Sequence, residues 1–479
     1  MVTADIRSWL GGRYTDSAAA RYQVRSPVDG EVVAEVHRAG PDTVDEAVRA
    51  ASAAVVADRR SSPYARRDRC LAIADRFLAR REEIAALVTA ETGRIYQGTL
   101  AEVDKAADGF RLAGEEAVRL AGRTLPVAAT DKLVMTRWRP TGVWAVVTPW
   151  NFPVNIPVEY LGPLVATGNA AVWKPAPTTV ASADLVLRCM VEAGLPEGQV
   201  TLVATDDTAV AGHLVGHPQV VGVGLTGSTA TGEAVSRRAA GKRLLLELGG
   251  NGPIIVFADA DLMHAAEAIA LSCFTASGQV CSAGGRILAD SRIAGPLAEA
   301  VAARAGDYPT GDPYQPATVL GPVHLPALAT RFEEQVTAAT RDGARVLTGG
   351  RHLPDFPTGQ YLPATVVGDV AVEAALSRQE SFAPVAPIVP LPASELVAEA
   401  NRSGYGLSTA VFTADLGRAM DALDDLEFGS VVVNDRSTYW ELHLPFGGWE
   451  GKDSGTGRVG VPAVVRAVCQ QQTLSLSRP

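Results

Sequence analysis

The sequence predicts an α/β protein with two doubly wound parallel sheets and a small, separate β segment. Along two stretches of the chain, short apolar runs alternate with helix-like segments, which is typical of parallel strands covered by helices on both faces. Gly249-Gly250 separates these stretches, and two further segments fit neither of them. The 479 residues suffice for about three domains of ordinary size, which argues against a lone binding module.

The first stretch opens with helices and continues with strands. Small apolar residues recur at helical spacing in residues 43–58, and the charged, Ala-rich residues 65–120 predict two or three amphipathic helices. The apolar runs that we predict to be its strands are 143–147, 170–173, 199–204, 220–225 and 244–248.

The second stretch repeats this pattern after residue 250. Residues 262–277 predict a helix, and the predicted strands are 253–257, 286–289, 384–390, 408–413 and 430–434. The segments 131–139 and 469–476 fit neither sheet, and the first alternates apolar and polar residues like a half-exposed strand. Because exposed strand edges require partners, we expect these two segments to pair.

Composition and charge restrict the class of protein. Hydrophobic residues make up 47% and charged residues 20%, the balance of a soluble globular protein. We find neither a run of roughly 18 apolar residues nor a secretory signal, so we expect a cytoplasmic protein without a membrane partner. The net charge of −10 disfavours binding to nucleic acid.

The cysteines and histidines do not suggest disulfides or a metal site. The five cysteines are widely spaced without a CxxC pair, and we expect them to be free thiols: Cys70, Cys189, Cys273, Cys281 and Cys469. The seven histidines lack ligand spacing, so no metal is expected.

Cys281 is the first candidate for chemistry. It follows a Gly-containing turn, Ser277-Gly278-Gln279, at the end of a predicted helix. A thiolate is a strong nucleophile, and backbone N–H groups in such a turn can lower the pKa of the thiol and bind an oxyanion. The alternative is that Cys281 is a buried small hydrophobic residue, the interpretation kept for the other four cysteines.

Glu247 is the second candidate. Leucines flank it at the end of an apolar strand, and desolvation there would raise its pKa toward neutrality, which suits a general base. A capping or salt-bridged Glu is the alternative. Residues 222–227 also match GxGxxG, which would make Glu247 a ribose ligand. However, Gly222 and Gly224 lie inside a predicted strand, so the better phosphate-binding turn is 227–232, which opens a helix.

Several motifs occur together along the chain. They are PWNFP at 149–153, KPA at 174–176, LTGST at 225–229, LELGG at 246–250, GQVC at 278–281, ESF at 380–382, Asn434, PFGG at 445–448 and SG at 454–455. In this order and near this spacing, the sequence resembles the NAD(P)-dependent aldehyde dehydrogenase superfamily over nearly its whole length. The resemblance implies that one sheet domain binds the cofactor, that the other is catalytic, and that the β segment is an oligomerisation arm.

The resemblance also implies domain limits and an assembly. Residues 1–120 and 141–248 would form the dinucleotide-binding domain, and residues 249–448 the catalytic domain. Residues 121–140 and 465–479 would form the arm of a homodimer or homotetramer.

Three residues would carry the reaction. The resemblance implies that Cys281 attacks a small aldehyde, that the Asn151 amide donates to the oxyanion, and that Glu247 activates the hydrolytic water. Chemistry supports these roles, because a thiohemiacetal oxygen needs donors and a thioester needs a deprotonated water. A coenzyme A-acylating enzyme or a catalytically silent dinucleotide-binding protein is the alternative, and Glu247 counts against the first.

The resemblance implies a set of cofactor residues and shows departures from the family pattern. Lys174 would bind the adenosine ribose, Trp150, Gly227 and Ser228 would lie near the pyrophosphate, and Glu380 and Phe382 would bind the nicotinamide ribose. Pro177 stands where a ribose-binding Glu is frequent, and Tyr160 replaces a Lys near the base. Because Asp206 and Asp207 would repel a phosphate, we expect NAD in preference to NADP.

The aldehyde entrance offers two interpretations. Its candidate residues are Phe152, Arg436, Tyr439, Trp440, His443 and Phe446. Arg436 and His443 could recognise an anionic group, as in a semialdehyde or a phosphonoaldehyde. Alternatively, Arg436 is a solvated loop residue or an oligomer contact, and the two aromatic residues Tyr439 and Trp440 line an apolar mouth.

Overall fold

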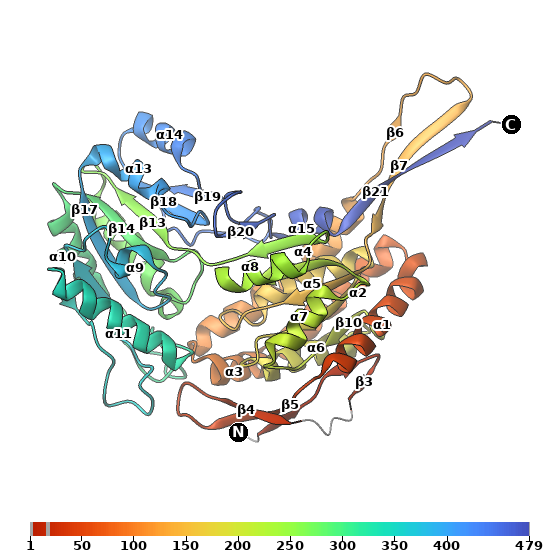
Figure 1. The fold of residues 1–479 in the computed structure, drawn as a ribbon, viewed down its shortest axis with the longest axis horizontal. Coiled ribbons are helices and arrows are strands. Elements are labelled where there is room, and N and C mark those ends of the chain that lie inside the picture. The colour runs from red at the N-terminus through yellow and green to blue at the C-terminus, as the bar shows by residue number, and fades with distance from the viewer. Residues whose placement is uncertain (1–2, 16–19, 479) are drawn as a thin grey trace.

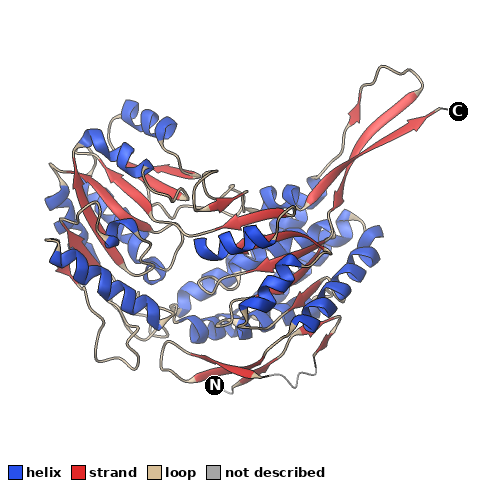
Figure 2. Ribbon diagram, in the orientation of Figure 1, coloured by secondary structure: helices blue, strands red, loops and turns tan. Residues whose placement is uncertain are grey.

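Two large sheets, each covered by helices on both faces, dominate the computed structural model of the chain (Figure 1). The structure describes residues 3–15 and 20–478. Figure 2 shows the strands of both sheets running between layers of helices, with a slender β arm projecting from one of the two parts. The predicted α/β class with two parallel sheets and a β arm is therefore confirmed.

The first sheet has a parallel centre. Its parallel strands, in spatial order, are β12 (Arg243–Glu247), β11 (Val220–Thr226), β8 (Val143–Val147), β9 (Ala170–Lys174) and β10 (Val200–Leu202). The chain runs outward from β8 through β9 to β10 and then returns to β11 on the other side of β8. Such a reversal of winding leaves a crevice at the carboxyl ends of the strands, where ligands bind in open α/β sheets.

Short antiparallel strands extend this sheet at both edges. β20 (Gly455–Thr456) pairs with β12, and β2 (Trp9–Leu10) with β3 (Arg13–Tyr14) continues it beyond β10. The sequence analysis assigned no strand before residue 43 and none near residue 455. These strands contain only two residues each, so no alternating pattern can form in them.

The glycines of the GxGxxG match serve close packing inside β11. A Cβ atom at Gly224 would lie 2.6 Å from the Tyr160 ring, and one at Gly222 would lie 2.7 Å from the Trp144 ring. The strand ends at Thr226, and α8 (Thr229–Arg238) begins three residues later with Ser228 as its N-cap. The turn that opens a helix is thus the one beginning at Gly227.

Helices α1 to α7 cover the first sheet. They are α1 (Pro41–Ala57), α2 (Pro63–Ala79), α3 (Arg81–Thr92), α4 (Tyr96–Arg119), α5 (Asn155–Thr167), α6 (Val180–Glu192) and α7 (Thr208–Gly216). Every residue of α5 is buried, because α2 and α4 pack against it on the side away from the sheet. Two helix faces, one from α4 and one from α5, can therefore meet beside the sheet.

The second sheet is parallel except for one edge strand. In spatial order it contains β15 (Arg345–Thr348), β16 (Thr365–Gly368), β17 (Val385–Leu391), β14 (Gly284–Asp290), β13 (Gly252–Val256), β18 (Ser408–Phe412) and β19 (Ser430–Val433). Its helices are α9 (Leu262–Phe274), α10 (Ala294–Ala305), α11 (Pro326–Arg341), α12 (Ala375–Arg378), α13 (Leu396–Asn401) and α14 (Leu416–Asp425). The antiparallel strand is β15.

Two smaller sheets lie outside these layers. β7 (Lys132–Pro140) pairs with β21 (Cys469–Ser477) and β6 (Thr124–Leu125), and the three form the arm (Figure 1). β1 (Ala4–Ile6), β5 (Val32–His37) and β4 (Arg21–Arg25) form a second three-stranded sheet, which the sequence analysis did not assign. The expected pairing of residues 131–139 with 469–476 is present.

The division of the chain into domains stays a prediction. One helix near the C-terminus, α15 (Val461–Ala467), packs with the first part of the structure. Its buried Val464 and Val465 belong to the same apolar core as α2, α4 and α5. Within residues 3–15 and 20–478, no helix combines the length and the apolar character that crossing a membrane requires.

Candidate active site

Loops that follow β8, β11 and β12 meet at the crevice of the first sheet. The loop after β8 carries Asn151, and Thr226 and Glu247 are the last residues of β11 and β12. β11 lies between β8 and β12, so these loops are neighbours in space although the chain separates them. The turn between α9 and β14 faces them and carries Cys281.

A left-handed turn delivers Cys281 to the crevice. α9 ends at Phe274, three residues before the predicted end, because Ala276, Ser277 and Gly278 have φ values of 52°, 56° and 74°. A Cβ atom at Gly278 would lie 2.1 Å from the carbonyl oxygen of Ala383. Non-glycine residues in this backbone region cost about 1–3 kcal/mol each and cluster at functional sites.

The Cys281 thiol and the Glu247 carboxyl form a hydrogen bond. Gly250 permits this close approach, because a Cβ atom there would lie 2.2 Å from the Cys281 carbonyl oxygen. Burial raises the pKa of Glu247 to about 8, as expected for a desolvated carboxyl. Glu247 Oε1 is buried and accepts no hydrogen bond from the residues that the structure describes.

The thiol differs from the expectation of a lowered pKa. Burial raises the pKa of Cys281 well above its ordinary value, and the Glu247 carboxylate raises it further. The physical reason is that the nearest charge is negative, so a thiolate would be repelled. Cys281 consequently needs a group that takes its proton as it attacks, and Glu247 is in hydrogen-bond contact with it.

Asn151 is held from both sides. Its side-chain Nδ2 atom donates to the backbone carbonyl oxygen of Gln279 at 3.0 Å. Its backbone carbonyl oxygen accepts from Arg94 Nη1 at 3.2 Å. The side chain is 5% exposed. Since an amide carries two N–H groups, one remains for an oxygen bound beside Cys281.

Two cavities meet at these residues. One, of about 460 Å³, extends toward α4 and α5, and the other, of about 230 Å³, extends toward α8 and Glu380. Both are lined by the same four residues: Asn151, Thr226, Glu247 and Cys281. The nucleophile and the carboxyl therefore face a compartment on each side. We call them the aldehyde-side and cofactor-side cavities, by the molecules that the resemblance implies.

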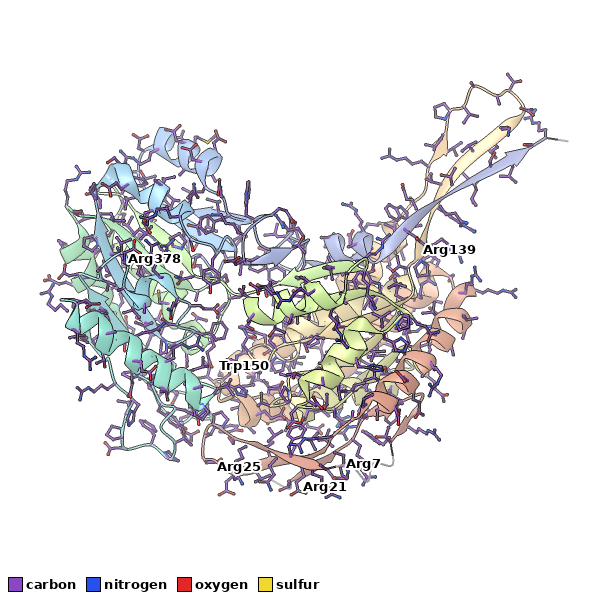
Figure 3. The ribbon with its side chains drawn as sticks, in the orientation of Figure 1. Arg7, Arg21, Arg25, Arg139, Trp150 and Arg378 are labelled. Carbon is purple, nitrogen blue, oxygen red and sulfur yellow. The ribbon has the colours of Figure 1, made fainter. Side chains whose placement is uncertain are left out.

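The cofactor-side cavity contains most of the residues expected to bind a dinucleotide. Besides the four shared residues, its lining includes Trp150, Gly227, Ser228, Glu380 and Phe382. Trp150 lies where the two sheet-containing parts adjoin (Figure 3), with its ring 5.6 Å from that of Phe382. Glu380 Oε1 accepts from Gly250 N at 3.0 Å, and burial raises the pKa of this carboxyl to about 7.

The N-terminus of α8 supports binding of a diphosphate at this cavity. Ser228 caps the helix by accepting from Thr231 N at 3.3 Å, and Gly227 precedes it without a side chain in the way. Helix N-termini present backbone N–H groups and a favourable dipole to anions. Residues around this cavity thus fit a dinucleotide.

Lys174 lies at the end of β9 and does not line the cofactor-side cavity. Its Nζ atom donates to the Pro175 carbonyl oxygen at 3.0 Å, and burial lowers its pKa to about 8. The predicted repulsion of a phosphate by two acids is weakened, because Arg38 donates to both oxygens of Asp206 at 2.6 and 2.9 Å. Asp207 is the N-cap of α7.

The candidate substrate residues divide into two groups. Phe152, Arg436, Trp440 and Phe446 line the aldehyde-side cavity. Tyr439 and His443 do not line it, because both side chains turn to Glu441: the Tyr439 hydroxyl donates to Oε1 at 2.9 Å, and His443 Nδ1 lies 3.5 Å from Oε2. The cavity lining does not support the expectation that these two residues contact the aldehyde, and the expectation stays a prediction.

Two helix faces contribute residues to this lining, and of these the sequence analysis named only Phe152. From the start of α4 onward the lining residues are Gly98, Ala101, Glu102 and Lys105, and near α5 they are Phe152, Asn155, Ile156 and Glu159. Both sets follow the i, i+3, i+4, i+7 spacing of one helix face. The sequence signal that could have revealed this face is Glu159, a charged residue within the otherwise apolar α5.

Arg94 and Glu102 fix the loop that carries Asn151. Their side chains form a buried ion pair, and the Arg94 guanidinium lies 4.1 Å from the centre of the Phe152 ring. Glu102 Oε1 accepts from the backbone N–H groups of Val154 at 2.8 Å and Asn155 at 3.0 Å. Glu102 thus caps the N-terminus of α5 from a neighbouring helix.

Tyr160, which departs from the family pattern, supports the floor of the site. Its hydroxyl lies 2.8 Å from Thr226 Oγ1, and its ring packs against Gly224. Because Thr226 lines both cavities, this contact fixes a shared wall.

Comparison with known proteins gives a consistent result. A model of the Aldehyde dehydrogenase family matches residues 14–474. The chain is similar to 3-sulfolactaldehyde dehydrogenase of Priestia aryabhattai, with 32% identity over 467 residues and 96% of each chain covered.

Solved structures agree with this match. The structure superimposes on succinate-semialdehyde dehydrogenase from Burkholderia pseudomallei with a TM-score of 0.94 and 30% identity, covering 98% of each chain. It also superimposes on betaine aldehyde dehydrogenase from Staphylococcus aureus in complex with NAD⁺, with a TM-score of 0.93 and 28% identity, covering 98% of this chain and 94% of the other.

Proposed function

Because this chain belongs to the aldehyde dehydrogenase family, we propose that it oxidises an aldehyde to the carboxylic acid through a covalent intermediate on Cys281. One observation carries the proposal: the thiol, the Glu247 carboxyl and the Asn151 amide line two cavities at once. An aldehyde can approach Cys281 from one cavity while a cofactor approaches from the other.

Attack begins with transfer of the thiol proton. The Glu247 carboxylate, in hydrogen-bond contact with Cys281, accepts the proton as sulfur bonds to the aldehyde carbon. The product is a thiohemiacetal whose oxygen carries negative charge. The remaining Asn151 N–H group donates to that oxygen, together with the Cys281 backbone N–H.

Bound NAD(P) supplies the hydride acceptor that converts this intermediate into a thioester. Trp150, Glu380 and Phe382 then act as the walls that orient the cofactor beside Cys281. Glu247 first releases the thiol proton to solvent, and the regenerated carboxylate then completes the cycle by taking a proton from the water that attacks the thioester. Its raised pKa, about 8, makes it a stronger base than an exposed carboxylate.

Two other outcomes are less well supported. Transfer of the acyl group to coenzyme A does not need a base for water, whereas the buried carboxyl of Glu247 contacts the thiol. A catalytically silent binding protein does not need a nucleophile, an amide donor and a carboxyl around one point. Hydrolysis uses all three groups.

We propose a small anionic aldehyde as the substrate. Arg436 lines the aldehyde-side cavity, and its side chain forms no hydrogen bond or ion pair with a residue of the described chain. The names of similar proteins support this class, since sulfolactaldehyde and succinate semialdehyde both carry an anionic group. Another similar structure is named for betaine aldehyde, which is cationic, and its name does not support an anionic substrate.

The test traps the thioester. Glu247→Gln should form NADH in a single burst that is slower than in the wild type, because the thiol loses its proton acceptor, and should then turn over very slowly, because the water loses its base. Mass spectrometry of the quenched variant should find an acyl group on Cys281. An unmodified thiol together with weakened NAD binding would instead make Glu247 a ribose ligand and overturn the mechanism.

We also propose that residues 1–120 with 141–248 bind the dinucleotide, that residues 249–448 form the catalytic domain, and that the arm joins a homodimer or homotetramer. The arm projects from the first sheet, and most residues of β21 are exposed (Figure 1). Unpaired strand edges favour association with another chain. Deletion of residues 469–479 should lower the mass measured by light scattering; a monomeric full-length chain at micromolar concentration would contradict the proposal.

A further inference from the structure

The aldehyde-side cavity contains two pairs of charged residues that differ in how the protein satisfies them. In the first pair, Glu102 accepts two backbone N–H groups on one oxygen and Arg94 on the other. Arg94 also donates to the Asn151 carbonyl oxygen. These two residues have partners inside the protein and leave little capacity for a ligand.

In the second pair, both residues have unused hydrogen-bonding capacity. Lys105 Nζ lies 4.3 Å from the centre of the Trp440 ring and forms no hydrogen bond with any described residue. Glu159 is 6% exposed and accepts one hydrogen bond, from Asn155 Nδ2 at 2.8 Å. In the described chain no ion pair within 4.0 Å joins Lys105 and Glu159, although their charges interact.

Arg436 adds a second cation to the lining of this cavity, with its side chain exposed to solvent. Burial lowers the pKa of Lys105, and the Glu159 and Glu102 carboxylates oppose this shift. The Arg436 guanidinium lowers the pKa further, and Glu441 opposes it. Two cations that repel each other at one wall, neither with a hydrogen bond to the described chain, form a site for an anion. Lys105 thereby extends the anion site proposed at Arg436.

Glu159 lines the same cavity as Cys281 and Glu247. Its charge acts on Cys281 and Glu247 as well as on Lys105. Its other carboxyl oxygen accepts no hydrogen bond from the described chain, and Glu159 lines the cavity. A substrate with a polar group that pairs with this oxygen gains a hydrogen bond that the protein itself does not make.

We infer that the aldehyde carries a hydroxyl group near its carbonyl carbon in addition to its anionic group. Burial raises the pKa of Glu159 to about 8, and this carboxyl pairs with the hydroxyl, which can both donate and accept a hydrogen bond. Lys105 and Arg436 bind the anion. This inference rests on the proposed oxidation and specifies its substrate class. An anionic aldehyde without the hydroxyl would bring its chain against an unpaired carboxyl, and a cationic aldehyde would meet two cations.

Four aldehydes separate the two contributions. 3-Sulfolactaldehyde has the hydroxyl and the anion, 3-sulfopropanal lacks the hydroxyl, lactaldehyde lacks the anion, and propanal lacks both. We expect kcat/KM for 3-sulfolactaldehyde to exceed that for each single-deletion aldehyde by about tenfold or more, the size of one lost polar recognition contact. Betaine aldehyde should be poorer than 3-sulfopropanal.

Two variants assign the recognition to residues. Glu159→Leu, which removes both carboxyl oxygens, should bring the ratio of 3-sulfolactaldehyde to 3-sulfopropanal toward one while the ratio of 3-sulfolactaldehyde to lactaldehyde stays high. Lys105→Met should lower the second ratio and spare the first. Glu115→Leu and Lys132→Met, at exposed positions of α4 and β7, are the matched controls and should leave both ratios unchanged.

The outcomes distinguish the inference from the proposed function. Similar kcat/KM values for all four aldehydes, ratios unchanged in the variants, or a preference for betaine aldehyde would each overturn the inference and leave the oxidation standing. If no aldehyde yields NADH or NADPH and none labels Cys281, both fail. Unchanged NAD binding by each variant excludes misfolding as the cause of a changed ratio.

Discussion

The cavities on the two sides of Cys281 are built from different parts of the chain. Loops after β8, β11 and β12, together with the segment around Glu380, line the cofactor side. Faces of α4 and α5 line much of the aldehyde side, where Lys105 and Glu159 have unused hydrogen-bonding capacity. The cofactor side thus consists mainly of loops held by the sheet, and the aldehyde side of charged helical residues.

This difference separates the chemistry from the choice of substrate. Residues that line both cavities can act on the bond that changes, whichever aldehyde is bound. Residues that line only the aldehyde side can change affinity for one aldehyde relative to another without touching Cys281. The four residues that line both cavities form the boundary between them. Variants at this boundary should therefore impair the oxidation of every aldehyde. Variants of residues on one side only should change the ratio of kcat/KM between two aldehydes or between two cofactors.

The largest effect is expected at the boundary itself. Cys281→Ala should reduce aldehyde oxidation by more than about a thousandfold, because losing covalent catalysis costs several powers of ten. NAD affinity, measured by calorimetry, should not change, since the wall of the cofactor side is intact. Residual turnover above about a thousandth of the wild-type rate would remove Cys281 from the role of nucleophile.

The sequence predicted the boundary and the cofactor side better than the aldehyde side. Cys281, Asn151 and Glu247 stand in short motifs, because turns after strands use few residues and depend on glycine. Lys105 and Glu159 stand on helices, where only the folded packing of α4 against α5 brings them together. The raised pKa of Cys281 also could not be predicted, since it depends on burial and on the Glu247 carboxylate.

Loops without secondary structure were the least predictable region. The sequence placed Tyr439 and His443 at the aldehyde because they precede a family motif. Their contacts with Glu441 are set by side-chain directions in the loop, which residue spacing does not encode.

Asn151 should give the second-largest effect. Asn151→Ala removes one donor to the thiohemiacetal oxygen, which typically lowers kcat by about 100- to 1,000-fold. The burst of NADH from the first turnover should slow by this factor, while KM and NAD affinity change little. A burst at the wild-type rate would show that Asn151 only orders the loop between Arg94 and Gln279.

A smaller effect is expected from pH. Burial raises the pKa of Glu247 to about 8, so raising the pH from 7 to 9 converts the acid into the base that activates water. The hydrolysis of the thioester should accelerate by about tenfold over this interval and level off above it. Rapid-quench measurement of the acyl enzyme gives this rate. Glu247→Gln is the control, and a profile of the same shape in that variant would assign the ionisation to another group.

The smallest effect is expected beyond the boundary, at Asp206. Arg38 holds this carboxylate in a bidentate pair and lowers its pKa, and the charge of Lys174 also acts on it. The resemblance implies that Lys174 binds the adenosine ribose. Because the Arg38 guanidinium balances its negative charge, Asp206 can repel a 2′-phosphate only weakly. The predicted preference of the wild type for NAD over NADP should therefore be modest.

Removing Arg38 should therefore sharpen the choice of cofactor. In Arg38→Ala the freed carboxylate should lower kcat/KM with NADP by about twofold to fivefold, a small effect because the charge pair is exposed, and leave NAD unchanged. Arg21→Ala, which removes an exposed partner of Glu35 at 3.4 Å in the small sheet that ends just before Arg38, is the matched control. Equal losses with both cofactors would mean that Asp206 lies outside the reach of the 2′ position, and selection between NAD and NADP would then fall to the residues around Lys174.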